Sequence, residues 1–330
     1  MAHMKLSQLL PQWTVNILRV SRVSISYFVE TLHWAIFDTT KSSILPNKTS
    51  DLADLMIKSH VLEKGITMPN RRLGFGYDRV RGLIDSISRA IKNYPSNSIE
   101  IQSALMDLEQ YLQIHETADF NLPSDISIGI KQLLKNKLYN TAVCSDTSSS
   151  EFFSPTKDFR EFALQRHSVR WYDKNSKINK QTLMQAIQVA QTAPSACNRQ
   201  STRIYVIEDD EKKQAVLDIQ NGNRGFGFLA DKILLLTADM RYWNYKYRTS
   251  AYLDTGIFCM NLLYALHYYK IGACTLNAHL DFKQRKALRV LLGYSKAEIP
   301  VVFIAIGKVP QKFMICGSQR LKTENICKFI

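Results

Sequence analysis

The sequence predicts an all-helical N-terminal region followed by a domain in which helices and strands alternate, of the α/β or α+β class. Three observations support this. Apolar residues recur at three- and four-residue spacings through 77–94 and 98–116, as on one face of a helix. Later in the chain, short β-rich runs such as 203–209 and 232–239 stand between helical stretches. Between these two regions the chain is polar, Ser-rich and without a period.

These features divide the chain into a helical extension at 1–145, a linker at 146–157 and a second domain at 158–330. The opening MAHM resembles a cloning scar, so we expect residues 1–3 to be foreign and the native sequence to begin at or just after Met4. The chain of 330 residues is long enough for two cores.

The extension holds several predicted helices. The stretch 77–94 places Val80, Leu83, Ile84, Ile87 and Ile91 on one stripe, and 98–116 repeats the pattern. An amphipathic helix is expected at 13–38, packed on the protein or a partner subunit, with a membrane-surface helix as the alternative. The segment HVLEKGITMPNRRLGFGY at 60–77 is either a loop that covers something or a plain connector.

In the second domain, an amphipathic helix at 179–193 has Asn179 as its expected N-cap. A long apolar helix is expected at 252–269. Strands are expected at 271–278 and 298–308, with a helix at 282–292 between them.

Composition and charge limit the classes of function. The chain is 45% hydrophobic and 22% charged, typical of a folded protein, and no apolar run reaches the roughly 20 residues of a membrane span. Six cysteines form no CxxC pair and no metal-like spacing with the histidines, which indicates reduced thiols in the cytoplasm. The net charge of +14 is uneven: residues 151–330 hold 27 basic against 15 acidic residues. This excess favours an anionic partner: nucleic acid, an acidic surface or a phosphorylated small molecule.

Several segments in order carry a resemblance to a known family. RHSVR (166–170) is followed by APSACNRQ (193–200), then by CTLNA (274–278), and finally by GK (307–308) with a basic C-terminal segment. Together they resemble the flavin-dependent nitroreductase family, over about 160–326. The resemblance implies an α+β fold with a central mixed or antiparallel sheet flanked by helices, bound FMN, and a homodimer with residues from both subunits in each site.

The resemblance also assigns site residues. Arg166 is expected to bind the FMN phosphate, Ser168 the phosphate or ribityl chain, and Arg170 the pyrimidine edge, because alternate residues of an extended segment share one face. His167 falls in the same motif but faces away on this spacing. The remaining expected cofactor-binding residues are implied by the same resemblance: Pro194 and Ser195 run along the flavin, Asn198 and Gln200 bond to the flavin or organise their loop, and Asn221 and Asn223 meet the pyrimidine edge. Leu276, Asn277 and Ala278 are expected to bring backbone N–H groups to flavin N5, and Lys308 and Arg320 to bind the phosphate. Where the family usually has proline after the glutamine, this chain has Ser201, and Cys197 is expected to be a buried structural thiol.

The leading hypothesis is an FMN-dependent oxidoreductase in which NADH or NADPH supplies electrons to a small acceptor such as a nitroaromatic or a quinone. No protein nucleophile and no metal are needed, because the cofactor carries the chemistry. The alternatives are a dehydrogenase or dehalogenase of a specialised substrate, and a non-catalytic flavin-binding module. Nucleic-acid binding is not expected, since the basic residues form no single stripe interleaved with aromatics.

Overall fold

The computed structural model describes most of the chain after residue 47 and scattered positions before it. The described residues are 11, 13, 14, 16–18, 20, 21, 24, 25, 27, 28, 48–138, 144–156, 158–243 and 247–330. Those from 13 to 28 are helical, and the rest of the helix predicted at 13–38 lies outside the described residues. Over the described part of the chain, no helix has the length and apolar character needed to cross a bilayer.

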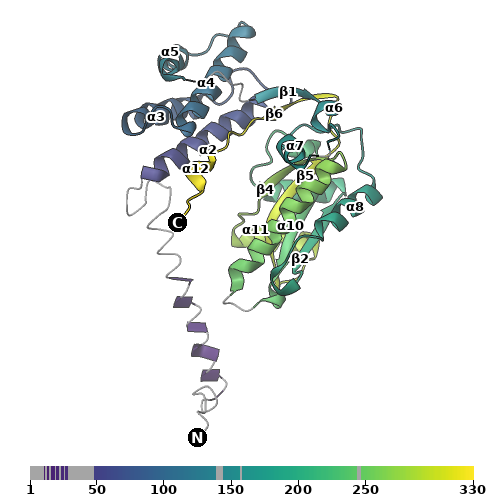
Figure 1. Cartoon of the computed structure of the whole chain (residues 1–330). Helices are drawn as coiled ribbons and strands as arrows, with labels where there is room; N and C mark the ends of the chain where they lie inside the picture. Colours follow the sequence, from purple (N-terminus) through teal and green to yellow (C-terminus); the bar gives the residue numbers. More distant parts are fainter. Residues whose placement is uncertain are drawn as a thin grey trace.

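The N-terminal region is a bundle of helices around one apolar core, as predicted (Figure 1). The stripe expected on α3 faces this core, where Val80, Leu83 and Ile87 are fully buried. On α4, Ile101, Leu105 and Leu108 are also fully buried, because they recur on one helical face. The bundle elements are α2 (Lys48–Ile66), α3 (Tyr77–Asn93), α4 (Ile99–Thr117), α5 (Ser124–Leu133) and the 3₁₀ turn η2 (Leu134–Asn136).

The C-terminal domain is built on a four-stranded sheet with the order β2-β3-β5-β4, and every pairing in it is antiparallel. The domain is therefore α+β, with an antiparallel sheet. The strands predicted from β-rich runs are all present. They are β2 (Thr202–Ile207), β3 (Lys232–Asp239), β4 (Gly272–Asn277) and β5 (Glu298–Gly307).

Helices cover both faces of this sheet, because successive strand residues point to opposite sides. On β3, Leu234 and Leu236 pack with α8 and α10, whereas Ile233 and Leu235 pack with α9 and α11. All residues of β3 are buried, as a strand covered on two faces requires. The helices are α7 (Phe159–Gln165), α8 (Lys180–Ala190), α9 (Asp210–Ile219), α10 (Arg248–Tyr268), α11 (Phe282–Leu292) and α12 (Thr323–Ile326), with 3₁₀ turns η3 (Ala196–Asn198), η4 (Gly227–Leu229) and η5 (Met240–Tyr242).

Asn179 is the N-cap of α8, as predicted: its side chain accepts from the backbone N–H groups of Gln181 and Thr182 at 2.7 and 3.3 Å. This cap satisfies donors that the first turn of a helix leaves without partners.

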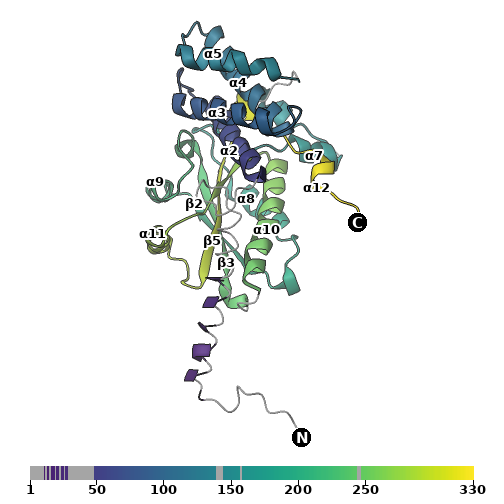
Figure 2. The same ribbon diagram turned by 90° about the vertical axis from the view of Figure 1, so that its left-hand side faces the viewer.

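A two-stranded antiparallel ribbon joins the bundle to the sheet domain (Figure 1), and Figure 2 shows the bundle stacked on one end of that domain. It pairs β1 (Cys144–Ser148) with β6 (Lys312–Cys316), and α6 (Ser149–Phe152) follows β1 directly. The segment predicted as a linker at 146–157 therefore carries regular structure. Its composition gave no sign of this, because the strand is formed by pairing with residues more than 160 positions later in the chain.

Candidate functional site

The segment RHSVR runs in an extended conformation beside β4. The backbone N–H of Val169 donates to the carbonyl of Ala273 at 2.9 Å, and the Val169 side chain is fully buried in the core. The Tyr172 hydroxyl holds the segment by bonding to the carbonyls of Val169 and Ala305 at 2.7 and 2.9 Å. Because Val169 faces the core, alternation turns Arg166, Ser168 and Arg170 toward the other side.

Arg166, which is half-buried, and Arg170, which is buried, have no carboxylate partner among the described residues. Arg170 is only 7% exposed, and one of its guanidinium nitrogens lies 3.2 Å from the Cys316 sulfur. The Nε atoms of Arg166 and Arg170 are both buried and have no hydrogen-bond partner. A desolvated guanidinium group is costly unless an anionic group or a hydrogen-bond acceptor compensates it, so these two side chains suit an anionic ligand.

Basic groups gather around Arg166. Burial lowers the pKa of Arg166, and the nearby charge of Arg320 lowers it further. Burial also lowers the pKa of His167, whose Nδ1 lies 2.9 Å from the Cys316 carbonyl. His167 thus faces β6, as alternation predicts. The Ser168 hydroxyl is half-buried and bonds to none of the described residues. Arg166, His167 and Arg320 together form what we call the basic cluster, an arrangement suited to a phosphate.

Lys308 is not tied to the basic cluster by any contact in the described structure. Its ammonium group lies 3.5 Å from the carbonyl of Lys270, and its own carbonyl accepts from the backbone of Asp173. Its expected role as a phosphate ligand therefore stays a prediction.

The APSACNRQ loop lies elsewhere, against the N-terminal half of α10. The Ala196 backbone donates to the Asp254 carboxylate at 2.9 Å, and Gln200 donates to the Asn198 side chain at 2.9 Å. Asn198 and Gln200 thus organise the loop, one of the two roles expected of them. The loop and α10 border a hollow of about 220 Å³, whose lining includes Pro194 and Ser195.

Cys197 lies on the surface, so the prediction of a buried thiol is wrong. Cys197, Asn198 and Gln200 all have positive φ angles, between 49° and 53°. This succession of left-handed residues turns the loop outward from the core.

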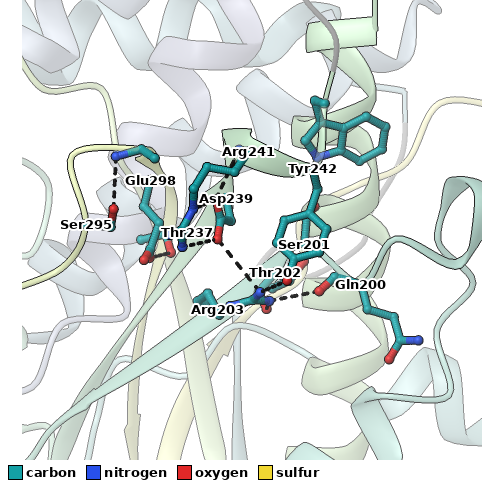
Figure 3. A network of polar contacts seen from close by, with 12 residues as sticks. Gln200, Ser201, Thr202, Arg203, Thr237, Asp239, Arg241, Tyr242, Ser295 and Glu298 are labelled. Atoms are coloured by element: carbon teal, nitrogen blue, oxygen red, sulfur yellow. Dashed lines mark hydrogen bonds and ion pairs between the residues drawn. The ribbon is translucent and has the colours of Figure 1, made fainter.

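Ser201, which stands where the family usually has proline, anchors the end of this loop. Its side chain is 1% exposed; its hydroxyl accepts from Trp243 Nε1 at 2.9 Å, and its carbonyl accepts from the Asp239 backbone. Figure 3 shows the polar network beyond it, where Arg203 bonds to the Gln200 carbonyl at 2.8 Å and lies 3.8 Å from the buried Asp239 carboxylate. Arg241 pairs with the same carboxylate at 2.6 Å. These bonds fix the loop without a proline.

The loop and the basic cluster are far apart within one chain. The loop contacts Asp254 on α10, whereas the cluster lies near Tyr264 and His267 at the other end of that helix. The 13 residues from 254 to 267 span roughly 20 Å at 1.5 Å per residue. The loop also leads into β2, the opposite edge of the sheet from β4. One copy of the chain therefore does not bring these two motifs into one site.

The loop expected at the pyrimidine edge, with Asn221 and Asn223, lies beside the end of β4, where backbone N–H groups were expected to reach flavin N5. Asn277 donates from its side chain to the Asn221 carbonyl at 3.3 Å, and Gln220 donates to the Asn277 carbonyl at 3.0 Å. The Asn223 amide is occupied otherwise, since it donates to the carbonyls of Leu217 and Gln220 at the end of α9. Leu276 is 6% exposed with its side chain in the core, and Ala278 is half-buried. A role for Leu276 and Ala278 is thus limited to the backbone, as expected.

One cation near Arg170 was missed by the sequence analysis. Lys64 lies near the end of α2, in the bundle, and donates to the Gly222 carbonyl at 2.7 Å. In the sequence, the one indication of a role for Lys64 was its position in the HVLEKG segment. For that segment, a loop covering another part of the protein was one of two interpretations. Because Lys64 and RHSVR are more than 100 residues apart in the sequence, no local pattern predicts that Lys64 lies near Arg170.

All six cysteines are free thiols, as predicted. Cys144 and Cys316 are direct partners across the β1–β6 ribbon. The Cys316 sulfur also lies 3.3 Å from the Thr67 hydroxyl. A hydrogen bond from Cys144 and the charge of Arg170 lower the pKa of Cys316 to about 6, against the opposing effect of burial. No cluster of metal-ligating side chains occurs in the residues that the structure covers.

Comparison with known proteins gives one family. Residues 163–223 and 215–308 match the model of the Nitroreductase family. The Bacillus subtilis (strain 168) protein YdgI, named as an NAD(P)H nitroreductase, is 32% identical over 90 residues, which are 27% of this chain and 43% of YdgI. The CLA biosynthesis enone reductase of Lactiplantibacillus plantarum is 45% identical over 56 residues, which are 17% of this chain and 26% of that protein. Each alignment thus spans less than two thirds of the relative.

Solved structures also align with about half of the chain. The enone reductase CLA-ER is 25% identical and aligns over 53% of this chain and 99% of its own, with a TM-score of 0.46. The Nitroreductase Family Protein from Streptococcus pneumoniae TIGR4 is 19% identical and aligns over 52% of this chain and all of its own, with a TM-score of 0.46.

Proposed function

We propose that this chain, in which residues 163–223 and 215–308 match the model of the Nitroreductase family, is an FMN-dependent oxidoreductase that takes electrons from NADH or NADPH. The observation that carries the proposal is the pair formed by the half-buried Arg166 and the buried Arg170, whose Nε atoms are both buried and have no hydrogen-bond partner among the described residues. FMN has an anion for each: a phosphate at one end and, on reduction, a negative pyrimidine edge at the other.

The described residues fit such a ligand. Arg166 and Arg320 would supply positive charge and N–H donors for the phosphate, with the neutral His167 ring beside them, and no carboxylate lies within ion-pair distance of Arg166 or Arg170 in the described structure. The Ser168 hydroxyl adds a free donor on the same side of the segment. Arg170, whose guanidinium group contacts the Cys316 sulfur at the end of β6, would bind the ring. Bidentate guanidinium groups suit phosphate better than a point charge does.

The bound FMN would supply the redox chemistry by accepting electrons from NAD(P)H and passing them to a small organic acceptor. The protein's part is to bind, orient and shield. Arg170 stabilises negative charge at the pyrimidine edge, and the buried surroundings strengthen that interaction. Nitroaromatics, quinones and activated alkenes are the acceptor classes to test; the last is suggested by the enone reductase relative.

A homodimer completes the proposed site. The APSACNRQ loop and the basic cluster lie at opposite ends of α10, so both can line one cofactor only if they come from two copies. The exposed face of α10 carries apolar side chains that suit a subunit interface: Tyr252, Leu253, Ile257 and Tyr268 are 48%, 63%, 37% and 70% exposed. The Pro194, Ser195, Asn198 and Gln200 contacts to FMN would then be made to the partner's cofactor.

Arg166→Ala tests this function. The loss of a charged hydrogen bond to phosphate costs about 1.5–3 kcal/mol, so we expect FMN affinity to fall about tenfold to a hundredfold while the fold remains. FMN binding is measured by quenching of flavin fluorescence, and folding by circular dichroism. Arg160→Ala removes the same charge from the exposed side of α7 and serves as the matched control.

A wild-type protein that is colourless and does not bind added FMN would refute the proposal. If FMN binds but neither NADH nor NADPH bleaches its visible absorbance, the flavin-binding part stands and the oxidoreductase part fails. In that case a non-catalytic flavin-binding module is the better interpretation.

A further inference from the structure

We propose that Lys64, which α2 carries from the N-terminal bundle into the sheet domain, binds the anionic pyrimidine edge of the reduced flavin. The inference rests on the function proposed above and adds to it a role for the N-terminal extension. The bundle would then be part of the cofactor site and would set the cofactor's reduction potential.

The Lys64 ammonium group lies against the loop that contains Gly222. Lys64 Nζ lies 2.7 Å from the Gly222 carbonyl and 5.5 Å from the centre of the Phe226 ring. Gly222 stands between Asn221 and Asn223, the loop predicted from the sequence to meet the pyrimidine edge. Its φ of 116° is one that residues with a side chain rarely adopt, so the loop conformation that presents this carbonyl requires glycine.

Lys64 is partly buried beside a second cation, Arg170. Burial lowers the pKa of Lys64, and the neighbouring Arg170 lowers it further. In the described part of the chain, neither cation has a carboxylate within 4 Å. The Lys64 ammonium has three donors, and the Gly222 carbonyl is the acceptor that the described residues offer it. Two like charges held together and partly desolvated need an anion between them.

The reduced flavin supplies such an anion and the oxidised flavin does not. The oxidised ring is neutral, whereas the reduced ring carries negative charge at its N1–C2=O edge. A cation at that edge binds the reduced state more tightly, which raises the reduction potential. Lys64 therefore stabilises reduced FMN more than oxidised FMN, whereas the basic cluster binds the phosphate equally tightly in both redox states.

A competing explanation is available inside the protein. The Cys316 sulfur, close to both cations, could serve as their counter-ion. Lys64 would then be structural, and its loss would raise the pKa of Cys316 without changing the flavin. The experiment below separates the two explanations.

The test measures the midpoint potential of bound FMN by spectroscopic redox titration in the full chain. In Lys64→Met, we expect reduced FMN to bind about tenfold more weakly relative to oxidised FMN, which is about 30 mV for a two-electron couple. Lys64→Gln, which keeps a donor for the Gly222 carbonyl, should show the same shift if Lys64→Met folds poorly. Lys64→Arg keeps the charge and should restore most of the potential.

The matched control is Lys58→Met, which removes a charge from the same helix where Lys58 pairs with Asp54 at 2.6 Å. It should leave the potential unchanged. An unchanged potential in Lys64→Met and Lys64→Gln, with FMN still bound, would overturn the inference and leave the proposed function intact. If wild-type protein binds no FMN, the proposed function fails and this inference fails with it.

Discussion

His267 is a histidine buried among aromatic rings beside the basic cluster. It is 5% exposed, and its ring lies 5.0–5.3 Å from the rings of Phe152, Phe153 and Phe162. Burial, followed by the charges of Arg166 and His167, lowers its pKa from 6.5 to about 4. Between pH 6.5 and about 4, His267 is therefore mostly neutral in the folded protein and mostly protonated in the unfolded chain.

The sign of the pH effect follows from this difference. Above pH 6.5 His267 is neutral in both states and contributes no pH dependence. As the pH falls from 6.5 toward 4, the unfolded chain binds the proton first, so the free energy of unfolding decreases. We expect His267→Phe to lose this part of the acid sensitivity, measured as urea midpoints across that window. His279→Phe, at an exposed position, is the control. An equal pH dependence in wild type and His267→Phe would contradict this account.

At the scale of single elements, the apolar face of α10 decides whether the proposed site can form. Leu253 is 63% exposed at the end of the helix that borders the APSACNRQ loop. We expect Leu253→Glu to convert a dimer into monomers, because a carboxylate would be buried without a partner at the interface. FMN affinity should fall with it, since half of each site would be lost.

The measurement is light scattering coupled to size-exclusion chromatography, with FMN binding followed in parallel. Val290→Glu makes the same change at a residue that is 76% exposed on α11, which covers the opposite face of the sheet. This control should remain a dimer and keep its FMN. A monomeric wild type, or a Leu253→Glu variant that stays dimeric, would show that α10 is not the interface.

The sequence predicted the regular elements well where their signal is local. The stripes of α3 and α4, the cap at Asn179 and the strands β2 to β5 all follow from spacing within a dozen residues. For RHSVR, alternation predicted that Val169 faces away from the ligand side, and Val169 is fully buried in the core. That Arg166, Ser168 and Arg170 meet one ligand stays a prediction.

What the sequence could not show depends on contacts between distant parts of the chain. The β1–β6 ribbon joins residues about 170 positions apart, and Lys64 reaches Gly222 from another domain. Cys197 was wrongly expected to be buried because its left-handed backbone depends on bonds from Asp254 and within the loop. The hydrogen bond from Trp243 to Ser201 fixes the loop where the family usually has proline. These two residues are likewise too far apart in the sequence for a local pattern to predict their contact.

At the scale of the whole molecule, β6 is shared by two hydrophobic cores. Its successive side chains point to opposite sides, so Phe313 is buried in the core of the sheet domain while Met314 packs on the core of the bundle. Further bonds cross the same junction, including Ser318 to Glu63 at 2.8 Å and Arg71 to the Met314 sulfur at 3.6 Å. We infer that the bundle and the sheet domain unfold together.

Leu108→Ala tests this coupling. Leu108 is fully buried on α4, and a Leu→Ala cavity costs about 2–5 kcal/mol. Unfolding is followed by tryptophan fluorescence in a background where Trp13 and Trp34 are replaced by Phe, so that only Trp171 and Trp243 of the sheet domain report.

If the two cores form one cooperative unit, the cavity in the bundle lowers the midpoint reported by tryptophans in the other domain. Far-ultraviolet circular dichroism, which reports all helices, should then give the same midpoint. Ile128→Ala, at a position 55% exposed on α5, removes a similar side chain without opening a cavity and should shift neither signal. Independent domains would give the opposite pattern: an early loss of helix signal with an unchanged tryptophan transition. That result would also argue against the proposed role of Lys64, because a bundle that unfolds independently of the sheet domain would not keep the Lys64 ammonium group at the flavin ring.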